Sequence, residues 1–304
     1  PKIQTRLSAT TRHSALSGRV IQTFPRKPWA YQTKISERVT GSGFMAKAFR
    51  NSETGEVVVS YAGTTQENLL DWILGNVPAG VGVYSVQVEE AIAFYLDVLK
   101  IQNVAASSVT FTGHSLGGGL ASLMAVFFDK NATVFDQAPF EMTAMQLDLI
   151  QKYINNLEHS GYVIPLQLKE YGAGSFSERE SNVTQILVAG EVLTFESGNA
   201  MKINGAIRTI DPMAKKVLGW GEGGSLAAAL QAVDLHSISL LAGFMNSDKF
   251  LDVVREYEEL LPRIFKGEYA GLEARQDDVS TLLDLLVQRQ ILGEGDLPPL
   301  SRTS

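Results

Sequence analysis

The chain contains a Gly-x-Ser-x-Gly segment, Gly113-His114-Ser115-Leu116-Gly117, of the kind that presents a nucleophilic serine on a tight turn. An apolar, β-branched run precedes it at 108–111, and small apolar residues follow it at 120–128. A strand, a sharp turn and a helix are the context that such a serine needs, because glycines keep side chains out of a crowded backbone. The segment therefore predicts Ser115 as the nucleophile of an acyl-transfer reaction, in preference to an ordinary glycine-rich turn.

A serine hydroxyl needs a general base, and the base needs a carboxylate that orients it. In enzymes with this turn, the chain order is serine, then acid, then histidine. The chain has four histidines. His13 precedes the strands, His114 belongs to the turn itself with its side chain directed away from that of Ser115, and His159 precedes the last strong strand. His236, which follows that strand, is the predicted base.

The acid should follow a strand, near the sheet edge where ligands bind in open α/β folds. Glu191 meets this condition directly after the predicted strand 185–189. Asp211 lies on a later loop and keeps the same chain order, and Asp136 follows the predicted strand 132–135. We expect Glu191 first, with Asp211 as the main alternative and Asp136 behind both.

An oxyanion hole needs two amide donors. One is expected at Leu116, the residue after the nucleophile. The other is expected in the loop 61–65, where Gly63 permits a tight turn and Thr64 offers an amide and a hydroxyl.

The elements that position these residues alternate between strands and helices, which indicates an α/β fold with a mostly parallel sheet covered by helices on both faces. We expect a basic arm at 1–36, a catalytic domain at 37–248 with an insertion or lid at 140–182, and a helical extension at 249–304. Further predicted strands lie at 43–48 and 56–61, around a turn at 51–55, and predicted helices lie at 66–74, 84–100, 142–157, 225–233, 249–261 and 279–290.

The composition permits a large core, since 45% of the residues are hydrophobic and 19% are charged. The absence of cysteine excludes disulfides, thiolate metal sites and a cysteine nucleophile. No apolar run reaches membrane-spanning length and no signal-peptide pattern opens the sequence. Because the first residue is Pro1, we expect a processed or excised fragment.

The net charge of −7 argues against nucleic acid as a partner. The range 1–36 carries seven lysines and arginines and no acid, so the remainder of the chain carries −14. We expect a solvated leader beside an acidic domain, with contact to anionic lipid headgroups or to a partner chain as the alternative.

Three segments, 57–65, 68–72 and 112–121, resemble the class 3 lipase family of α/β hydrolases. The resemblance spans about residues 40–245 and implies Thr64 as an oxyanion donor, Ser115 as nucleophile, His236 as base and Glu191 as acid, where the family usually has Asp. Ala62 replaces the usual arginine, and 136–139 departs from the family's Gly-x-Pro-Arg type of segment. The long excursion 140–182 resembles bacterial lipase or phospholipase domains of larger secreted or effector proteins.

Together these features predict a serine carboxylic-ester hydrolase that acts on lipid esters and needs neither a metal nor an organic cofactor. An acyltransferase, a non-lipid esterase and a catalytically inactive interaction module are the alternatives. The expected partners are a lipid substrate, a transiently contacted membrane surface and a larger parent polypeptide or partner protein. A secreted or delivered location is favoured, and apolar residues at 69–74 and 142–154 would form an acyl site or lid, unless they belong to the core.

Overall fold

The computed structural model describes residues 33–63, 81–191, 193, 205–210, 235–246, 250–252 and 254. These residues fall into two compact units. The first holds the described residues 33–63, 81–187 and 205–208, and the second holds the described residues of 188–193 and those from 209 onward. Ser115 belongs to the first unit, and Glu191 and His236 belong to the second.

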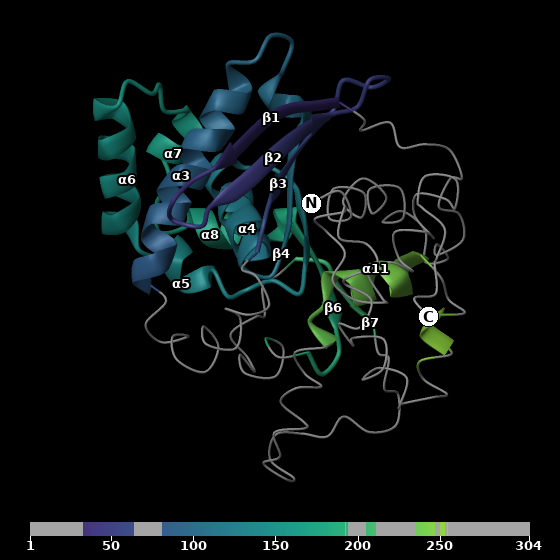
Figure 1. Cartoon of the computed structure of the whole chain (residues 1–304). Helices are drawn as coiled ribbons and strands as arrows, with labels where there is room; N and C mark the ends of the chain where they lie inside the picture. Colours follow the sequence, from purple (N-terminus) through teal and green to yellow (C-terminus); the bar gives the residue numbers. More distant parts are fainter. Residues whose placement is uncertain are drawn as a thin grey trace. The chain divides into compact units, whose positions relative to one another are not determined.

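Seven strands form one sheet in the order in which they occur along the chain (Figure 1). The first three strands pair antiparallel, and β3 to β6 pair parallel. A mostly parallel sheet in an α/β fold is therefore confirmed. The strands are β1 (Thr33–Val39), β2 (Met45–Arg50), β3 (Val57–Tyr61), β4 (Val109–His114), β5 (Ala132–Phe135), β6 (Val183–Val188) and β7 (Ile207–Ile210).

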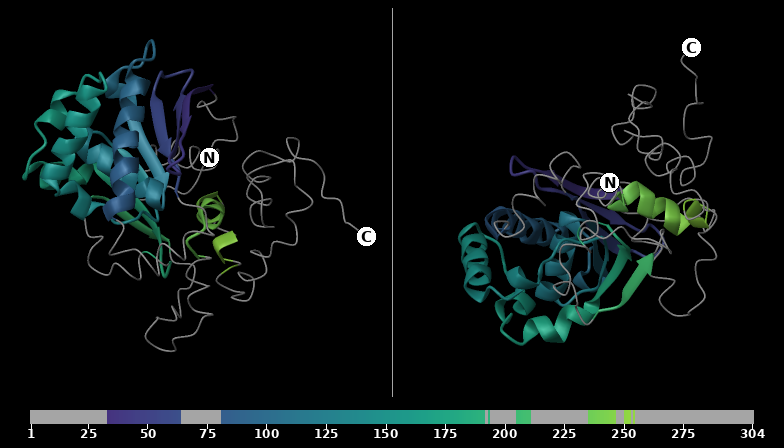
Figure 2. Two further views of the ribbon diagram at one scale, coloured as in Figure 1. Left: turned by 60° about the vertical axis from the view of Figure 1, so that its left-hand side comes forward. Right: turned by 90° about the horizontal axis from the view of Figure 1, so that it is seen from below.

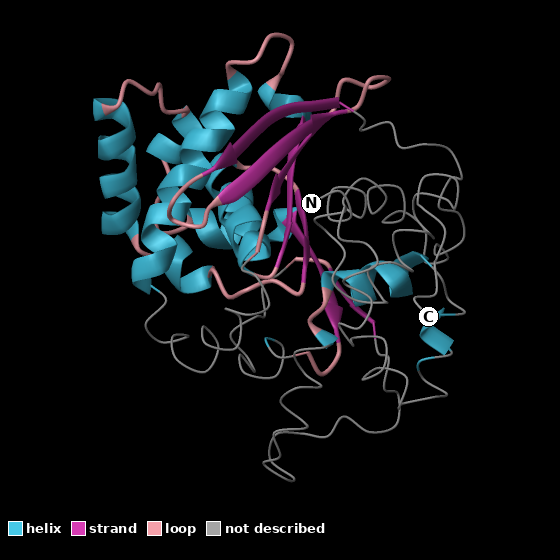
Figure 3. Ribbon diagram, viewed as in Figure 1, coloured by secondary structure: helices cyan, strands magenta, loops and turns pink. Residues whose placement is uncertain are grey.

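The helices of the first unit gather on one side of its strands (Figures 2 and 3). None of the helices within the described ranges is long and apolar enough to cross a membrane. The helices are α3 (Val81–Leu99), α4 (Leu116–Phe128), α5 (Glu141–Ala144), α6 (Leu147–His159), α7 (Leu166–Lys169), α8 (Ser175–Arg179) and, in the second unit, α11 (Ile238–Asn246), with short 3-10 turns η1 (Ala106–Ser108) and η2 (Glu180–Asn182).

The core lies between the central strands and α4. All residues of β3, β4 and α4 are buried, as expected for apolar runs covered by packed layers. Tyr95 of α3 packs edge-on against Phe111 of β4, with ring centroids 5.1 Å apart. Burial raises the pKa of Tyr95 to about 12, so this side chain is neutral at physiological pH.

The hairpin turn predicted at 51–55 is present. The side-chain oxygen of Asn51 accepts hydrogen bonds from the amides of Glu53 and Thr54, at 2.8 and 3.1 Å. Gly55 closes the turn with φ +73°, a conformation that glycine adopts without strain. The turn joins β2 to β3 and so sets the register of the strand that leads toward the site.

Two strands were not expected. β1 begins at Thr33, so the last four residues of the range 1–36, predicted as an arm, belong to the sheet. β7 follows the strand taken as the last strong one. Both lie at edges of the sheet, where exposed positions weaken the apolar pattern.

The predicted helix 84–100 is α3, and the predicted helix 142–157 is divided into α5 and α6. The excursion 140–182 consists of α5 to α8 and η2. The predicted helices 66–74, 225–233 and 279–290 and most of 249–261 lie outside the described residues. The domain boundaries at 36, 248 and 249 stay predictions.

Candidate active site

Ser115 occupies a strained turn between β4 and α4. Its backbone has φ 55° and ψ −128°, outside the regions that residues other than glycine usually adopt. Its side chain is buried, and its Oγ makes no hydrogen bond within the described part of the chain. Strain of this kind is concentrated at functional sites, because the surrounding structure must hold the residue in place.

Glycines make this turn possible. A Cβ on Gly113 would lie 2.1 Å from the carbonyl oxygen of Gly117, and a Cβ on Gly117 would lie 2.2 Å from the carbonyl oxygen of Tyr61. Real Cβ atoms essentially never approach backbone so closely. The segment therefore needs glycine at both positions to bring Ser115 to the start of α4.

The loop after β3 packs against the same turn. Tyr61 is the register partner of Gly113 in the parallel pair of β3 and β4. Two residues later, a Cβ on Gly63 would lie 2.7 Å from the carbonyl oxygen of His114 and 3.1 Å from the Cβ of Ser115. Thr64, the predicted oxyanion donor, follows Gly63 directly but lies outside the described residues.

Leu116, the other predicted donor, is the first residue of α4. The first amides of a helix have no acceptor within it and carry the positive end of the helix dipole. The amide of Leu116 directly follows the serine in the chain. It is therefore suited to donate a hydrogen bond to a negatively charged oxygen.

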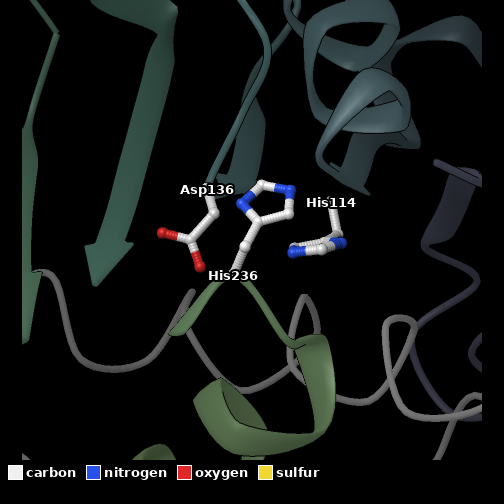
Figure 4. Close-up of side chains that lie close together, drawn as sticks. All are labelled: His114, Asp136 and His236. Carbon is white, nitrogen blue, oxygen red and sulfur yellow. The ribbon is translucent and has the colours of Figure 1, made fainter. Parts of the chain in front are cut away.

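The end of β5 and the loop after it hold the turn at Ser115 through two backbone hydrogen bonds. The amide of Ser115 donates to the carbonyl of Phe135 at 3.0 Å, and the amide of Ala138 donates to the carbonyl of Ser115 at 2.9 Å. Asp136, between these two contacts, is fully buried and has φ 39°. It lies at the end of β5 near His114, which ends β4 (Figure 4).

The second unit contains a buried acid–base pair. Nδ1 of His236 lies 2.6 Å from Oε2 of Glu191, and the amide of Leu193 donates to the same oxygen at 2.8 Å. The side chains are 2% and 0% exposed. A carboxylate on Nδ1 fixes the orientation and tautomer of an imidazole, so that Nε2 is the nitrogen that exchanges protons.

Local structure explains how the chain supplies this pair. Glu191 follows β6 through a turn in which Gly190 has φ +80° and the amide of Glu191 donates to the carbonyl of Val188 at 3.3 Å. His236 precedes α11, where the hydroxyl of Ser237 accepts a hydrogen bond from the amide of Leu240 at 3.4 Å. Ser237, between the histidine and Ile238, thus caps α11.

The structure therefore brings Glu191 together with His236, and it brings Ser115 together with Gly63 and the loop of Asp136. Asp211, the alternative acid, lies outside the described residues. Sequence reasoning did not anticipate the left-handed backbone of Asp136 or the cap at Ser237. A Ser directly before an apolar helical run was the available signal for the cap.

Comparison with known proteins gives a family match. The model of the Tle-like phospholipase domain matches residues 30–237. No curated protein sequence matches the chain.

Solved structures resemble the chain at low identity. The Rhizomucor miehei lipase propeptide complex is 17% identical, with a TM-score of 0.34 over 58% of this chain and 56% of that chain. The Lip2 lipase of Yarrowia lipolytica is 12% identical, with a TM-score of 0.39 over 67% and 78%. The chain thus spans little more than half of the Rhizomucor miehei lipase. Because the family match covers more than half of its length, the chain belongs to the family of Tle-like phospholipase domains and is a lipase- or phospholipase-like α/β hydrolase.

Proposed function

We propose that this protein is a serine carboxylic-ester hydrolase that cleaves lipid esters through an acyl-enzyme. The observation that carries the proposal is the backbone of Ser115, held at φ 55° at the start of α4 by glycines that admit no side chain. A strained backbone at this position is expected where the function depends on the position of the Ser115 hydroxyl. Membership of the phospholipase domain family supports an ester bond as the target.

In the proposed reaction, Oγ of Ser115 attacks the ester carbonyl while Nε2 of His236 takes its proton. Glu191 orients the imidazole and stabilises the imidazolium that forms. The amides of Leu116 and Thr64 hold the oxyanion of the tetrahedral intermediate. His236 then protonates the leaving alcohol, and the same histidine activates the water that releases the fatty acid. The buried contact between Nδ1 of His236 and Oε2 of Glu191 supports these two roles.

We propose glycerophospholipids as the first substrates to test, with triacylglycerols second. The family description supports phospholipids, and the basic range 1–36 favours anionic headgroups. Met142, Met145 and Leu147, at α5 and the start of α6, are 75%, 56% and 36% exposed, which suits contact with a lipid surface. Delivery within a larger secreted or effector polypeptide belongs to the same proposal.

Labelling with a fluorophosphonate tests the nucleophile. We expect the parent protein to be labelled and Ser115→Ala to remain unlabelled. Ser122→Ala is the matched control, because Ser122 lies within α4 and is also buried. Its hydroxyl donates to the carbonyl of Gly118 at 2.9 Å and lies 3.5 Å from Oε1 of Gln137. A parent protein that does not react would overturn the proposed function and favour an interaction module.

Product analysis tests the substrate class. We expect free fatty acid from phospholipid vesicles, and less turnover of short-chain soluble esters. Transfer of the acyl group to an added alcohol in preference to water would identify an acyltransferase instead. Turnover of soluble esters alone would identify a non-lipid esterase.

A further inference from the structure

Exposed apolar side chains of the first unit gather at the edge of the sheet that carries Ser115. Single hydrophobic residues scattered over a surface are ordinary, but several of them at one edge call for an explanation. Five of the large hydrophobic side chains that are exposed in the described part of the chain lie at the carboxyl end of the parallel strands, namely Val39, Val86, Met142, Met145 and Leu147. We refer to these five residues as the apolar rim.

The methionines of the rim lie beside the serine turn. Met142 is in α5 and Met145 directly follows it, and α5 follows the carboxyl end of β5. The loop between β5 and α5 holds the nucleophile, since the amide of Ala138 donates to the carbonyl of Ser115 at 2.9 Å. The hydroxyl of Tyr171 donates to the last carbonyl of α5 at 3.0 Å. The two methionines are therefore presented to solvent from an anchored helix.

The valines of the rim lie on the other side of β4. β1 ends at Val39, and the turn after it lies at the carboxyl end of β3, because β2 pairs antiparallel with β3. Gln87 of α3 donates to the carbonyl of Ser42 in that turn at 3.0 Å, which places Val86 at the same edge. Because β4 lies between β3 and β5 in the sheet, the two groups flank the strand that leads to Ser115.

The charges near the methionines indicate which kind of lipid suits them. α5 and the first turn of α6 carry two acids, Glu141 and Asp148, and no base. Carboxylates repel an anionic headgroup and attract the ammonium group at the outer end of a choline or ethanolamine headgroup. The methionine part of the rim is therefore complementary to a zwitterionic phospholipid surface.

We propose that the apolar rim is a docking face for a zwitterionic phospholipid surface, with Met142 and Met145 inserting among the lipids. This inference rests on the proposed function, which supplies the lipid as the partner. Methionine side chains are unbranched and adapt to irregular apolar surroundings, as acyl chains are. Docking on the rim turns the Ser115 edge of the sheet toward the bilayer that supplies the substrate. The basic range 1–36, in contrast, selects anionic lipid through charge.

The absence of cysteine allows single cysteines to carry a polarity-sensitive fluorophore at chosen positions. The labelled variants of the full chain are Met142→Cys, Val86→Cys and, as the control, Val163→Cys. Each is combined with Ser115→Ala, so that the vesicles stay intact. The probe is a vesicle of phosphatidylcholine, with and without a quencher attached to the acyl chain.

Val163 is a matched control because it is 87% exposed but lies at the opposite end of the strands. The hydroxyl of the preceding residue, Tyr162, donates to Asp97 near the end of α3 at 3.1 Å, and α3 ends before β4 begins. Labels at 142 and 86 should shift to shorter wavelength on the vesicles and be quenched at least about threefold more than the label at 163, because only a label within the lipid escapes water.

Two double substitutions test affinity and lipid choice by cosedimentation. Met142→Gln with Met145→Gln should weaken binding to phosphatidylcholine vesicles at least about tenfold, since two apolar side chains no longer leave water. Val163→Gln should leave that binding at the parental level. Glu141→Gln with Asp148→Asn should lower the ratio of affinity for phosphatidylcholine to affinity for phosphatidylglycerol about fivefold at low salt.

The outcomes separate this proposal from the proposed function. Labels at 142 and 86 that stay in water, or a label at 163 that inserts equally, overturn the docking face and favour a protein as the partner of the rim. An affinity ratio that does not change overturns the choice of zwitterionic lipid. A parent protein without esterase activity overturns the proposed function, whereas insertion is measured independently in Ser115→Ala. Thermal unfolding checks that each variant is folded.

Discussion

The backbone of Tyr61 and Ala62 limits what position 117 can hold. Gly117→Ala would place a Cβ 2.2 Å from the carbonyl oxygen of Tyr61 and 2.6 Å from the carbonyl carbon of Ala62, and these backbone atoms cannot move cheaply. We expect Gly117→Ala to abolish ester hydrolysis and to destabilise the protein by at least about 2 kcal/mol. Hydrolysis and the Tm are the measurements. Gly41→Ala is the control, because its Cβ meets nothing within 4 Å, and it should behave like the parent.

Glu191 carries a second prediction. Glu191→Gln keeps the shape of the side chain but removes the charge that faces Nδ1 of His236 at 2.6 Å. We expect kcat to fall by about 100-fold to 1000-fold, with KM nearly unchanged, since the lost interaction matters most when the imidazolium forms. Steady-state kinetics on one phospholipid measures both. The assignment fails if Glu191→Gln keeps near-parental kcat while Asp211→Asn loses it.

The same residues show how much of the site was predictable. Ser115 could be predicted because the turn that presents it is formed by consecutive residues, and the glycines of such a turn are visible in the sequence. His236 and Glu191 required chain order and elimination, and their buried contact agrees with that choice of partners. The setting of Asp136 was not predictable, because its backbone angle and burial depend on contacts with β6 and with the turn.

At the scale of elements, the strands that are buried on both faces were predicted from the sequence, but the two edge strands were not. β3, β4 and β5 are short runs of apolar and β-branched residues. β1 reads Thr-Lys-Ile-Ser-Glu-Arg-Val, and its exposed side chains hide the strand within a charged segment. β7 has four residues, three of them exposed or half-buried. Pairing with a neighbouring strand, and not the local sequence pattern, determines that such segments form strands.

Asp97 joins three elements and yields a prediction about pH. Burial acts to raise the pKa of its carboxyl, but hydrogen bonds from Lys100, Tyr162 and Arg38 outweigh burial, so the pKa is lowered. Lys100 and Tyr162 lie 2.9 and 3.1 Å from its oxygens. A lowered pKa means that the stabilisation is present above the ordinary pKa of an aspartate and is lost as pH falls through the lower, folded-state value.

We therefore expect Asp97→Asn to destabilise the protein at pH 7 by about 0.5–1 kcal/mol, since the group is partly exposed and solvent screens it. As pH falls through the lowered pKa of the folded state, the parent carboxyl is protonated too, and the difference should disappear. Urea unfolding at several pH values measures this. A difference that persists unchanged at low pH would show that packing, and not charge, is the contribution of Asp97.

Across the whole molecule, the uneven charge changes by one residue when the structure is taken into account. Lys34 was counted with the basic arm, but it lies in β1 and pairs with Glu37. Six bases and no acid remain before residue 33, at Lys2, Arg6, Arg12, Arg19, Arg26 and Lys27. Six bases and no acid in the range 1–32 would attract anionic membranes over about a Debye length.

Replacing these six bases with glutamine should weaken binding to vesicles rich in phosphatidylglycerol at least about tenfold at low salt, given roughly 1 kcal/mol for each base near a charged surface. Binding to neutral phosphatidylcholine vesicles and hydrolysis of a soluble ester should stay at the parental level, because Ser115 and its surroundings are unchanged. Cosedimentation and fatty-acid release measure the two effects. At about 0.5 M salt, the parent and the variant should converge, since exposed charges are then screened within a few ångströms. Equal losses on anionic and neutral vesicles would mean instead that the range supports the fold, and the lipid-contact interpretation of the arm would be wrong.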